Sequence, residues 1–417
     1  MCRDGFCKRY DFLLRAIMKI IVVGAGAGGL MAAAQAACSG AGVTLIERNE
    51  KPGKKLYITG KGRCNVTNLC SPREFLENVV SNPKFLFGAI YSFPPESTIA
   101  YLEENGTKVK VERGNRVFPV SDKSSDVIRA LVRGAEKSGV KFVRDDVKKI
   151  EKHDNVFTIS GRNAVYEADR VILACGGVSY PSTGSNGDGF SLAVSLGHTV
   201  TPLRPALVPI ILKDDVSSLK GLSLKNVTAS AGKYSLFGEM LFTDTGVSGP
   251  IILSLSSRIN SGNVKGLKLF LDLKPALDEE KLDKRVLSDF AKAKNKQFKN
   301  SLGDLLPQSM IPFVVKRSGI DPDKPINSVS REERERLVKT LKCLEFTISG
   351  LAPIEQGIVT AGGVNVSEVD PKTMESKIVK GLYFAGEMLD LDAPTGGFNI
   401  QIALSTGYAA GKAAAKK

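Results

Sequence analysis

The sequence has no tryptophan and only two histidines, His153 and His198. Two histidines give little material for a zinc site or a serine–histidine triad. The cysteines number seven and include no Cys-x-x-Cys spacing, so we expect free thiols in a reducing cytoplasm rather than a disulfide framework. No apolar run approaches the roughly 20 residues of a membrane-spanning helix. We therefore expect a cytoplasmic protein with no metal site and no membrane span.

The chain has 417 residues, of which 42% are hydrophobic and 24% charged, as in ordinary globular proteins. This length predicts two or three domains. The net charge is +14, which favours anionic ligands in general. The densest basic stretch, 281–299, reads as one face of a helix and matches no nucleic-acid-binding module. We expect a small-molecule substrate rather than a nucleic-acid partner, and the composition does not fix the oligomeric state.

A glycine-rich turn follows the first apolar strand. Gly24-Ala-Gly26-Ala-Gly28-Gly29 satisfies G-x-G-x-x-G, and the residues after it form a small-residue helix. Such glycines permit a tight turn and a close approach to a pyrophosphate, which the helix N-terminus attracts. Glu47 ends the second strand 18 residues after Gly29, near the spacing of a ribose-binding carboxylate. The segment 18–47 therefore predicts a β-α-β dinucleotide site.

Three distant segments favour FAD over NAD. The apolar run 171–177 ends in Cys175-Gly176-Gly177 and resembles a strand that returns to the cofactor in two-dinucleotide flavoproteins. The run 381–387 resembles their C-terminal strand, which passes the ribityl chain. The run 396–401 opens a last helix, whose N-terminal dipole would face the flavin ring. A bare NAD domain has no use for these pieces, so we expect non-covalent FAD.

The chain resembles the BaiN-like and aminoacetone-oxidase-like flavoproteins over about residues 18–417. The motifs that carry the resemblance are Gly53-Lys54-Lys55, 59–68, 116–121, 180–189, 242–250, 360–364, 373–377 and 386–401. The resemblance implies an α/β fold: a split FAD-binding Rossmann-like domain with an inserted β-barrel and a small helical insert. The expected bounds are 18–191 and 348–417 for the FAD domain, 192–275 and 331–347 for the barrel, and 276–330 for the insert. Residues 1–17 are expected to be a dispensable N-terminal extension.

The predicted cofactor-binding residues come from two sources. The sequence motifs give Gly24, Gly26, Ala27, Gly28, Gly29, Glu47, Cys175, Gly176, Gly177, Gly386, Glu387, Gly396, Gly397, Asn399, Ile400 and Gln401. The resemblance and the loop 59–65 add Arg48, Lys54, Gly60, Gly62, Arg63, Cys64, Asn65 and Val147. The sequence assigns no catalytic residue.

Three functions stay open at this point. The first is an NAD(P)H-dependent flavin reductase of an activated C=C bond, such as an enone in a steroid-like acid. The second is an oxidase that uses O₂ on a small amine. The third is a flavin-binding RNA-modifying or regulatory protein, which the charge of +14 makes conceivable. Because the chain has one G-x-G-x-x-G, any nicotinamide is expected to bind transiently at the flavin.

Overall fold

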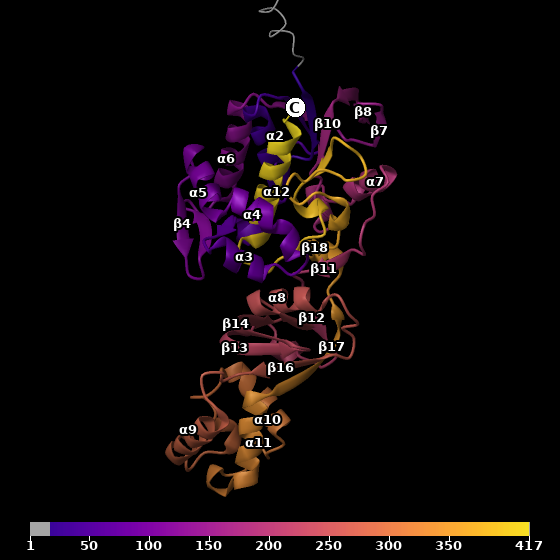
Figure 1. Cartoon of the computed structure of the whole chain (residues 1–417). Helices are drawn as coiled ribbons and strands as arrows, with labels where there is room; N and C mark the ends of the chain where they lie inside the picture. Colours follow the sequence, from indigo (N-terminus) through magenta and orange to yellow (C-terminus); the bar gives the residue numbers. More distant parts are fainter. Residues whose placement is uncertain (1–16, 417) are drawn as a thin grey trace, which may run out of the picture. The chain divides into compact units, whose positions relative to one another are not determined.

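The computed structural model describes residues 17–416, so the predicted extension 1–17 lies, except for Ile17, outside the described residues. The chain divides into two compact units (Figure 1). The first contains both ends of the chain, up to Leu203 and from Val359 onward, and the second is Arg204–Ile358. Within the described residues, no helix combines the length and the apolar character needed to cross a bilayer.

The first unit is built on a five-stranded parallel sheet in the order β19-β10-β1-β2-β6. The strands are β1 (Lys19–Val23), β2 (Gly42–Glu47), β6 (Lys141–Arg144), β10 (Arg170–Leu173) and β19 (Leu382–Phe384). β1 and β10 are buried almost throughout, as expected of parallel strands covered on both faces. The sheet joins N-terminal and C-terminal strands, so the nucleotide-binding fold is split in sequence, as predicted.

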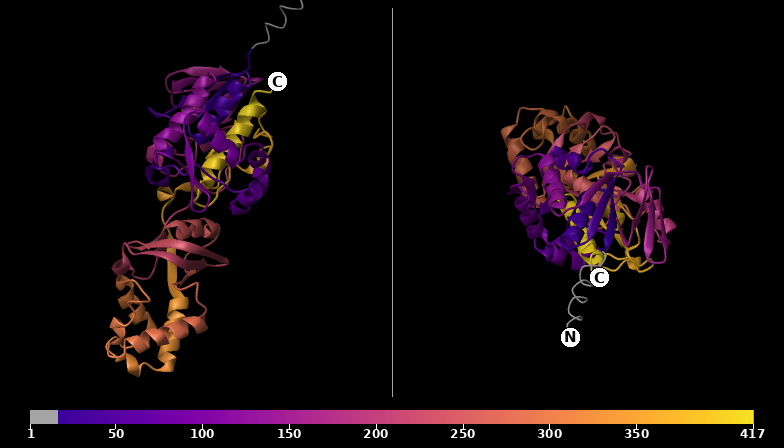
Figure 2. Two further views of the ribbon diagram at one scale, coloured as in Figure 1. Left: turned by 90° about the vertical axis from the view of Figure 1, so that its left-hand side faces the viewer. Right: turned by 90° about the horizontal axis from the view of Figure 1, so that it is seen from above.

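Two helices from opposite ends of the chain lie side by side on this sheet. They are α2 (Ala27–Cys38) and α12 (Phe398–Ala414), drawn in indigo and yellow in Figure 2. A Cβ atom on Gly407 would overlap the carbonyl oxygen of Gly28, and one on Gly411 would overlap that of Ala32. Since residue numbers rise together along this contact, the helices run parallel. Glycines therefore set their close packing.

The remaining elements of the first unit surround this core. The helices are α3 (Pro72–Asn78), α4 (Phe87–Ser92), α5 (Pro95–Glu104), α6 (Ser124–Lys137) and α7 (Asp188–Ser195). One small antiparallel sheet has the order β3 (Thr67–Asn68), β5 (Arg116–Pro119), β4 (Val109–Glu112). Another contains β7 (Lys149–His153), β8 (Val156–Ser160) and β9 (Val165–Ala168).

The second unit contains the predicted barrel and the predicted helical insert. The barrel closes in the antiparallel order β12 (Ile210–Leu212), β15 (Gly246–Ser248), β14 (Tyr234–Phe242), β13 (Ser223–Ala231), β16 (Lys268–Asp272), β17 (Leu344–Leu351). Its helices are α8 (Pro250–Ile259), α9 (Glu279–Lys292), α10 (Ile311–Ser318) and α11 (Arg331–Lys342). The short strands β11 (Arg204–Ala206) and β18 (Val359–Ala361) stand at the two unit boundaries.

The boundaries differ from the expected ones. The first unit extends to Leu203 rather than 191, because α7 belongs to it through the ion pair of Asp188 with Arg48. The return to the first unit comes at Val359 rather than 348, since β17 continues the barrel to Leu351. Residues 331–342 form α11, which packs on α9 and α10 and also contacts the barrel strands β16 and β17, so the assignment of 331–347 to the barrel stays a prediction.

Candidate cofactor site

The turn between β1 and α2 has the geometry that its glycines predict. Gly24 has a φ of +100° and donates its N–H to the carbonyl of Ile46 at 2.8 Å, which ties the turn to β2. A Cβ on Gly24 would lie 2.5 Å from the carbonyl oxygen of Ala174, and one on Gly29 would overlap that of Gly24. Both positions therefore require glycine for the fold alone.

The N-terminus of α2 can accept an anion. The residue before the helix is Gly26, no side chain caps the helix, and the first turn of the helix has no acidic residue. A Cβ on Gly26 would have no atom within 4 Å. The first N–H groups of a helix have no partner inside the helix and lie at the positive end of its dipole. The arrangement suits a pyrophosphate.

Glu47 lies beside this turn. One of its carboxylate oxygens accepts a hydrogen bond from the backbone N–H of Ala25 at 2.7 Å. The other accepts from the backbone and side-chain nitrogens of Asn49, at 2.9 and 2.7 Å. A carboxylate has about four acceptor positions. The carboxylate is thus oriented by the protein and retains capacity for a ribose hydroxyl.

Arg48 is engaged by two carboxylates. Its guanidinium lies 2.6 Å from Asp146 and 2.5 Å from Asp188, and the bond from Arg48 lowers the pKa of Asp188. Val147, the other residue implied here, is buried in the core next to Asp146. Arg48 therefore ties the β6–β7 connection and α7 to the end of β2. Its predicted contact with the cofactor stays a prediction.

A second cluster lies at the other side of the α2 turn. The Lys55 ammonium lies 2.7 Å from Glu387 and 2.7 Å from the hydroxyl of Ser179. Glu387 also accepts the backbone N–H of Thr360 at 2.8 Å. A Cβ on Gly177 would overlap the Thr360 hydroxyl, so that glycine allows the cluster to close. Four segments far apart in sequence meet at this ion pair.

The two neighbouring lysines of this loop point in different directions, and the predicted contact of Lys54 with the cofactor stays a prediction. Lys54 is 37% exposed and faces Glu50 at 3.7 Å on the surface. Lys55 points inward to Glu387. The Gly53-Lys54-Lys55 motif was the available signal, but only the loop geometry decides which lysine faces the sheet. Gly53 donates its N–H to the carbonyl of Ala25 at 2.8 Å, which places this loop against the α2 turn.

The loop 59–65 has an unusual backbone. Gly60, Lys61, Gly62 and Cys64 all have φ between +57° and +85°. Such φ values in Lys61 and Cys64 cost energy and persist only where the surroundings impose them. A bond from the Cys64 N–H to the carbonyl of Thr59 at 3.0 Å holds the turn.

Arg63 supports this loop from outside. Its guanidinium lies 2.5 Å from both Glu112 and Asp122 and 4.1 Å from the ring centroid of Phe118. The hydrogen bonds that Arg63 donates to these carboxylates, to Glu112 first, raise its pKa. Because both carboxylates belong to the protein, we interpret Arg63 as a residue that positions the loop. Its predicted contact with the cofactor stays a prediction.

Of the two cysteines predicted at the cofactor, Cys64 is buried and Cys175 is partly buried. Burial raises the pKa of Cys64 to about 11 and that of Cys175 to about 12. Both are therefore protonated at neutral pH and are poor nucleophiles. Next to Cys64, the side-chain oxygen of Asn65 is buried and has no hydrogen-bond partner within the described part of the chain. A bound ligand with an N–H or O–H donor would satisfy it.

The N-terminus of α12 repeats the features of α2. It starts after Gly397 (φ +96°) without a side-chain cap and without an acidic residue in its first turn. A Cβ on Gly397 would overlap the backbone of Thr67, which belongs to the strand following Asn65. Gly396, with φ +122°, precedes it. The start of α12 and the loop 59–65 are thus brought together.

Two predicted side chains at this helix start are used inside the protein. The Gln401 carbonyl accepts from Thr67 and Thr98 at 2.6 and 2.7 Å, and its amide donates to Phe93 O and Ser405, both at 3.0 Å. Asn399 accepts from the backbone N–H of residue 393 and donates to its carbonyl. Both amides hold α12 in place. Only backbone N–H groups of residues 398–400 remain for a ligand at this end.

The residues present fit FAD. The α2 and α12 N-termini belong to parallel helices, and α12 begins about eight residues further back than α2 at their contact, or roughly 12 Å. That spacing suits a pyrophosphate at Gly26 and a flavin ring at the start of α12. The ribityl chain of FAD would span the distance between them. Glu47 supplies a ribose acceptor, and the Asn65 oxygen supplies an unmatched acceptor near the second helix start.

A family model described as HI0933-like protein Rossmann domain matches residues 18–413. The chain belongs to the HI0933-like family. The resemblance stated from the motifs is confirmed, and the fold of the family agrees with the split domain and inserted barrel described above. The protein is therefore an FAD-dependent oxidoreductase.

Two curated relatives match the HI0933-like chain along nearly its whole length. One, 33% identical over 411 residues, is the 3-dehydro-bile acid Δ(4,6)-reductase of Clostridium scindens, covering 96% of this chain and 99% of the relative. Another, 32% identical over 400 residues, is the ribosomal RNA dihydrouridine synthase of Haemophilus influenzae, covering 93% and 96%. Among solved structures, 3-ketosteroid-Δ4-(5α)-dehydrogenase of Rhodococcus jostii is similar with a TM-score of 0.52 and 16% identity, covering 97% of this chain and 99% of that one. This last likeness shows the fold alone.

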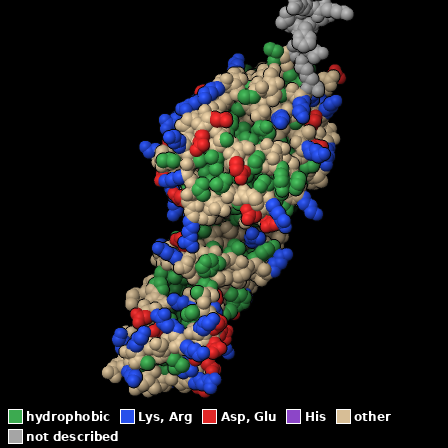
Figure 3. All heavy atoms as spheres, turned by 60° about the vertical axis from the view of Figure 1, so that its left-hand side comes forward, with side chains coloured by type: hydrophobic (Ala, Val, Ile, Leu, Met, Phe, Trp, Pro, Cys, Tyr) green, Lys and Arg blue, Asp and Glu red, His purple; other side chains and the backbone are tan. Residues whose placement is uncertain are grey.

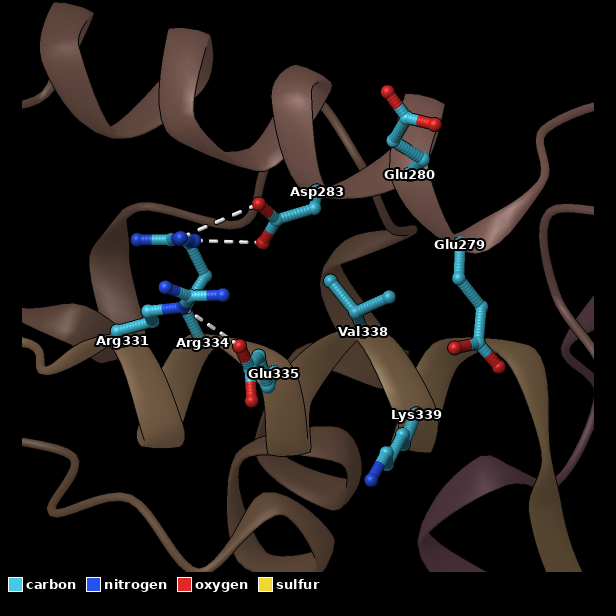
Figure 4. A pocket seen from close by; sticks show the side chains of 8 residues that line it. All are labelled: Glu279, Glu280, Asp283, Arg331, Arg334, Glu335, Val338 and Lys339. Carbon is cyan, nitrogen blue, oxygen red and sulfur yellow. Dashed lines mark hydrogen bonds and ion pairs between the residues drawn. The ribbon is translucent and has the colours of Figure 1, made fainter.

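The HI0933-like chain also has a hollow of about 510 Å³ in its helical part, between α9 and α11 (Figure 4). Arg334 there meets Asp283 at 2.6 Å, and Arg331 meets Glu335 at 2.9 Å. Glu279, Glu280 and Lys339 line the rest with Val338. The Arg334–Asp283 pair joins α11 to α9, whereas Arg331 and Glu335 pair along α11, and none of the predicted cofactor residues lines the hollow.

Proposed function

We propose that the protein is an FAD-dependent ene-reductase, which adds two hydrogens across a C=C bond conjugated with a carbonyl, in a ring of a steroid-like small molecule. The observation that carries the proposal is the 33% identity, over 96% of this chain, with a Δ(4,6)-reductase of a 3-dehydro bile acid. A 3-oxo compound with Δ4 and Δ6 double bonds is a conjugated dienone, the kind of enone that hydride attacks at the β carbon.

Bound and reduced FAD would supply that hydride. The chain's own contribution is placement and electrostatics. The backbone N–H groups in the first turn of α12 would stabilise negative charge on a ring edge lying against them. The α2 N-terminus and Glu47 would hold the other half of the cofactor. The Lys55–Glu387 ion pair lies at the ends of β10 and β19 and would fix the backbone between the two helix N-termini.

We propose that the flavin is held without a covalent bond. Cys64 is buried and Cys175 is partly buried, and burial raises their pKa values to about 11 and about 12. His198 is bonded on both ring nitrogens, to Glu368 at 3.1 Å and to Ser376 at 2.8 Å. These are the nucleophiles that commonly attach a flavin, and each is engaged or protonated. Full burial also keeps Cys64 from serving as the proton donor to a substrate.

The reductant in this proposal is NADH or NADPH, bound transiently. The chain contains one G-x-G-x-x-G, and the structure between residues 17 and 416 contains one five-stranded parallel sheet of the dinucleotide-binding type. A nicotinamide would therefore share the exposed face of the flavin with the substrate in turn. We place the protein in the cytoplasm, in keeping with cysteines that form no predicted framework.

A second candidate substrate is uridine in ribosomal RNA. The observation that favours it is the 32% identity, over 93% of this chain, with a ribosomal RNA dihydrouridine synthase. The chemistry is the same, because the C5=C6 bond of uracil is conjugated with the C4 carbonyl. The net charge of +14 suits a polyanion. On the face in Figure 3, however, Lys and Arg side chains are interspersed with Asp and Glu, so charge alone marks no RNA site. None of the relatives reported above is named for amine oxidation, and the oxidase alternative stays a prediction.

Product analysis tests the proposal. The purified protein with FAD and NADPH or NADH is incubated without oxygen with a 3-oxo-Δ4,6 bile acid, and in parallel with ribosomal RNA that lacks dihydrouridine. Mass spectrometry then reports the addition of two hydrogens. Reduction of the steroid alone supports the first candidate, and dihydrouridine at a defined position supports the second. Peroxide formation with amines, and no reduction of either substrate, would replace the proposal by the oxidase.

A further inference from the structure

Helix α4 exposes an aromatic pair. Phe87 is 57% exposed and Tyr91 is 50% exposed, and their rings stack with centroids 4.5 Å apart and planes 29° apart. Single exposed apolar side chains are common on protein surfaces, but two large aromatic rings stacked one turn apart and left to solvent form a flat platform. Nothing in the cofactor site uses these rings.

The platform has lysines on two sides and no acid in its own segment. Residues 78–95 contain four aromatic residues and one lysine, Lys84, but no Asp or Glu. Lys84 precedes Phe87 by three residues. A Cβ on Gly88 would lie 4.0 Å from the Cγ of Lys372, so the Lys372 side chain lies against α4 at the residue after Phe87. Both lysines are exposed.

This surface adjoins the segment that leads into α12. The N–H of Val80 donates to the carbonyl of Asp392 at 2.8 Å, and the Asn82 amide donates to that of Asp390 at 2.8 Å. The ring of Phe75 on α3 lies 4.9 Å from that of Phe398, the first residue of α12. The aromatic platform is thus fixed to the end of α12 at which we place the flavin ring.

We propose that Lys84, Phe87, Tyr91 and Lys372, the α4 surface, bind single-stranded RNA next to the target base. The proposal rests on the second candidate function, uridine reduction. Unstacked bases bind aromatic faces in a sequence-tolerant way, and lysines beside them meet the phosphates. A bile acid of the size considered above would not need such a platform outside the ring site. A second copy of the chain fits this surface less well. Two copies docked through it would bring Lys84 and Lys372 of one copy against the same two lysines of the other.

The test measures RNA binding by the FAD-loaded protein without any reductant, by fluorescence anisotropy of a labelled single-stranded RNA of mixed sequence. The double variant F87A/Y91A is expected to bind at least tenfold more weakly, because it removes the stacking platform. Phe237→Ala is the matched control, since Phe237 is 60% exposed on β14, and it should leave the affinity unchanged. Melting temperature and FAD content verify that each variant is folded.

Salt dependence provides the second readout. Each single-strand phosphate contact contributes about 0.7 to the slope of log affinity against log salt. The double variant K84M/K372M should therefore lower the slope by about 1.4, whereas F87A/Y91A should leave it nearly unchanged. Lys225→Met, on β13 of the other unit, is the control for the loss of a cation.

The outcomes separate the proposal from the function on which it rests. Dihydrouridine formation with unchanged RNA affinity in F87A/Y91A would overturn the α4 surface and leave uridine reduction intact. No RNA binding and no uridine reduction by the wild type would overturn both. A shift of F87A/Y91A from dimer to monomer in sedimentation, with RNA affinity unchanged, would assign the surface to a second copy of the chain instead.

Discussion

The Lys55 ammonium lies 2.7 Å from the Glu387 carboxylate, although 332 residues separate the two in sequence. The pair joins the loop after β2 to the end of β19, and it is about one-fifth exposed on each side. Ser179 and the backbone of Thr360 bond to the same carboxylate, so the end of β10 is included. This one contact ties the first, middle and last segments of the cofactor domain.

Lys55→Met should therefore destabilise the protein and loosen FAD. It leaves the Glu387 carboxylate without its cation, which costs about 1–3 kcal/mol for a partly buried charged partner. Lys54→Met, one residue away on the surface, is the matched control and should change neither property. Urea denaturation and FAD titration of the apoprotein measure the two effects. Equal behaviour of the two variants would show that the inward ion pair has no role.

Gly26 and Gly29 should respond differently to alanine. A Cβ on Gly26 would meet no atom within 4 Å, and the φ of Gly26 is −76°, so the Gly26→Ala variant should fold normally. Its methyl group should intrude on the space proposed for the pyrophosphate at the N-terminus of α2. A Cβ on Gly29 overlaps the Gly24 carbonyl, so Gly29→Ala should fail to fold or melt far lower. FAD affinity and melting of the apoprotein separate the cases. If Gly26→Ala bound FAD as tightly as the wild type, α2 would not hold the pyrophosphate.

Gly397→Val should lose FAD because it disturbs the start of α12. The backbone of Thr67 lies in the path of any side chain at position 397. The substituted residue also needs a φ of +96°, which a β-branched residue avoids. We expect lower apoprotein stability together with lost FAD. Loss of FAD at unchanged apoprotein stability would contradict this explanation and indicate a clash with the flavin itself.

Burial of Cys64 predicts a specific alkaline sensitivity. Burial raises its pKa from the ordinary value of 9.0 to about 11. A raised pKa means that the folded state keeps the proton, so this stabilisation is present below pH 9 and is lost as pH rises toward 11. By pH 10 the loss should be about 1 kcal/mol. Cys64→Ala should lose correspondingly less between pH 8 and 10 in urea denaturation, and parallel losses would contradict the assignment.

Local patterns could be predicted from the sequence, and long-range choices could not. The Gly24–Gly29 turn and Glu47 lie within one β-α-β unit, so their spacing alone places them together. The inward orientation of Lys55 depends on Glu387, far along the chain. The engagement of Gln401 by Thr67 and Thr98, and of Arg63 by Glu112 and Asp122, likewise depends on partners that no local spacing specifies.

The central claim is that the bound flavin delivers hydride to a C=C bond conjugated with a carbonyl. The most direct measurement is anaerobic stopped-flow absorbance of the photoreduced holoprotein mixed with a 3-oxo-Δ4,6 bile acid or with dihydrouridine-free ribosomal RNA. Our account predicts return of the oxidised flavin spectrum with one of these acceptors, without oxygen, and one equivalent of a product that has gained two hydrogens across one C=C bond. A reduced flavin that persists with both acceptors, yet reoxidises at once with O₂, would contradict it.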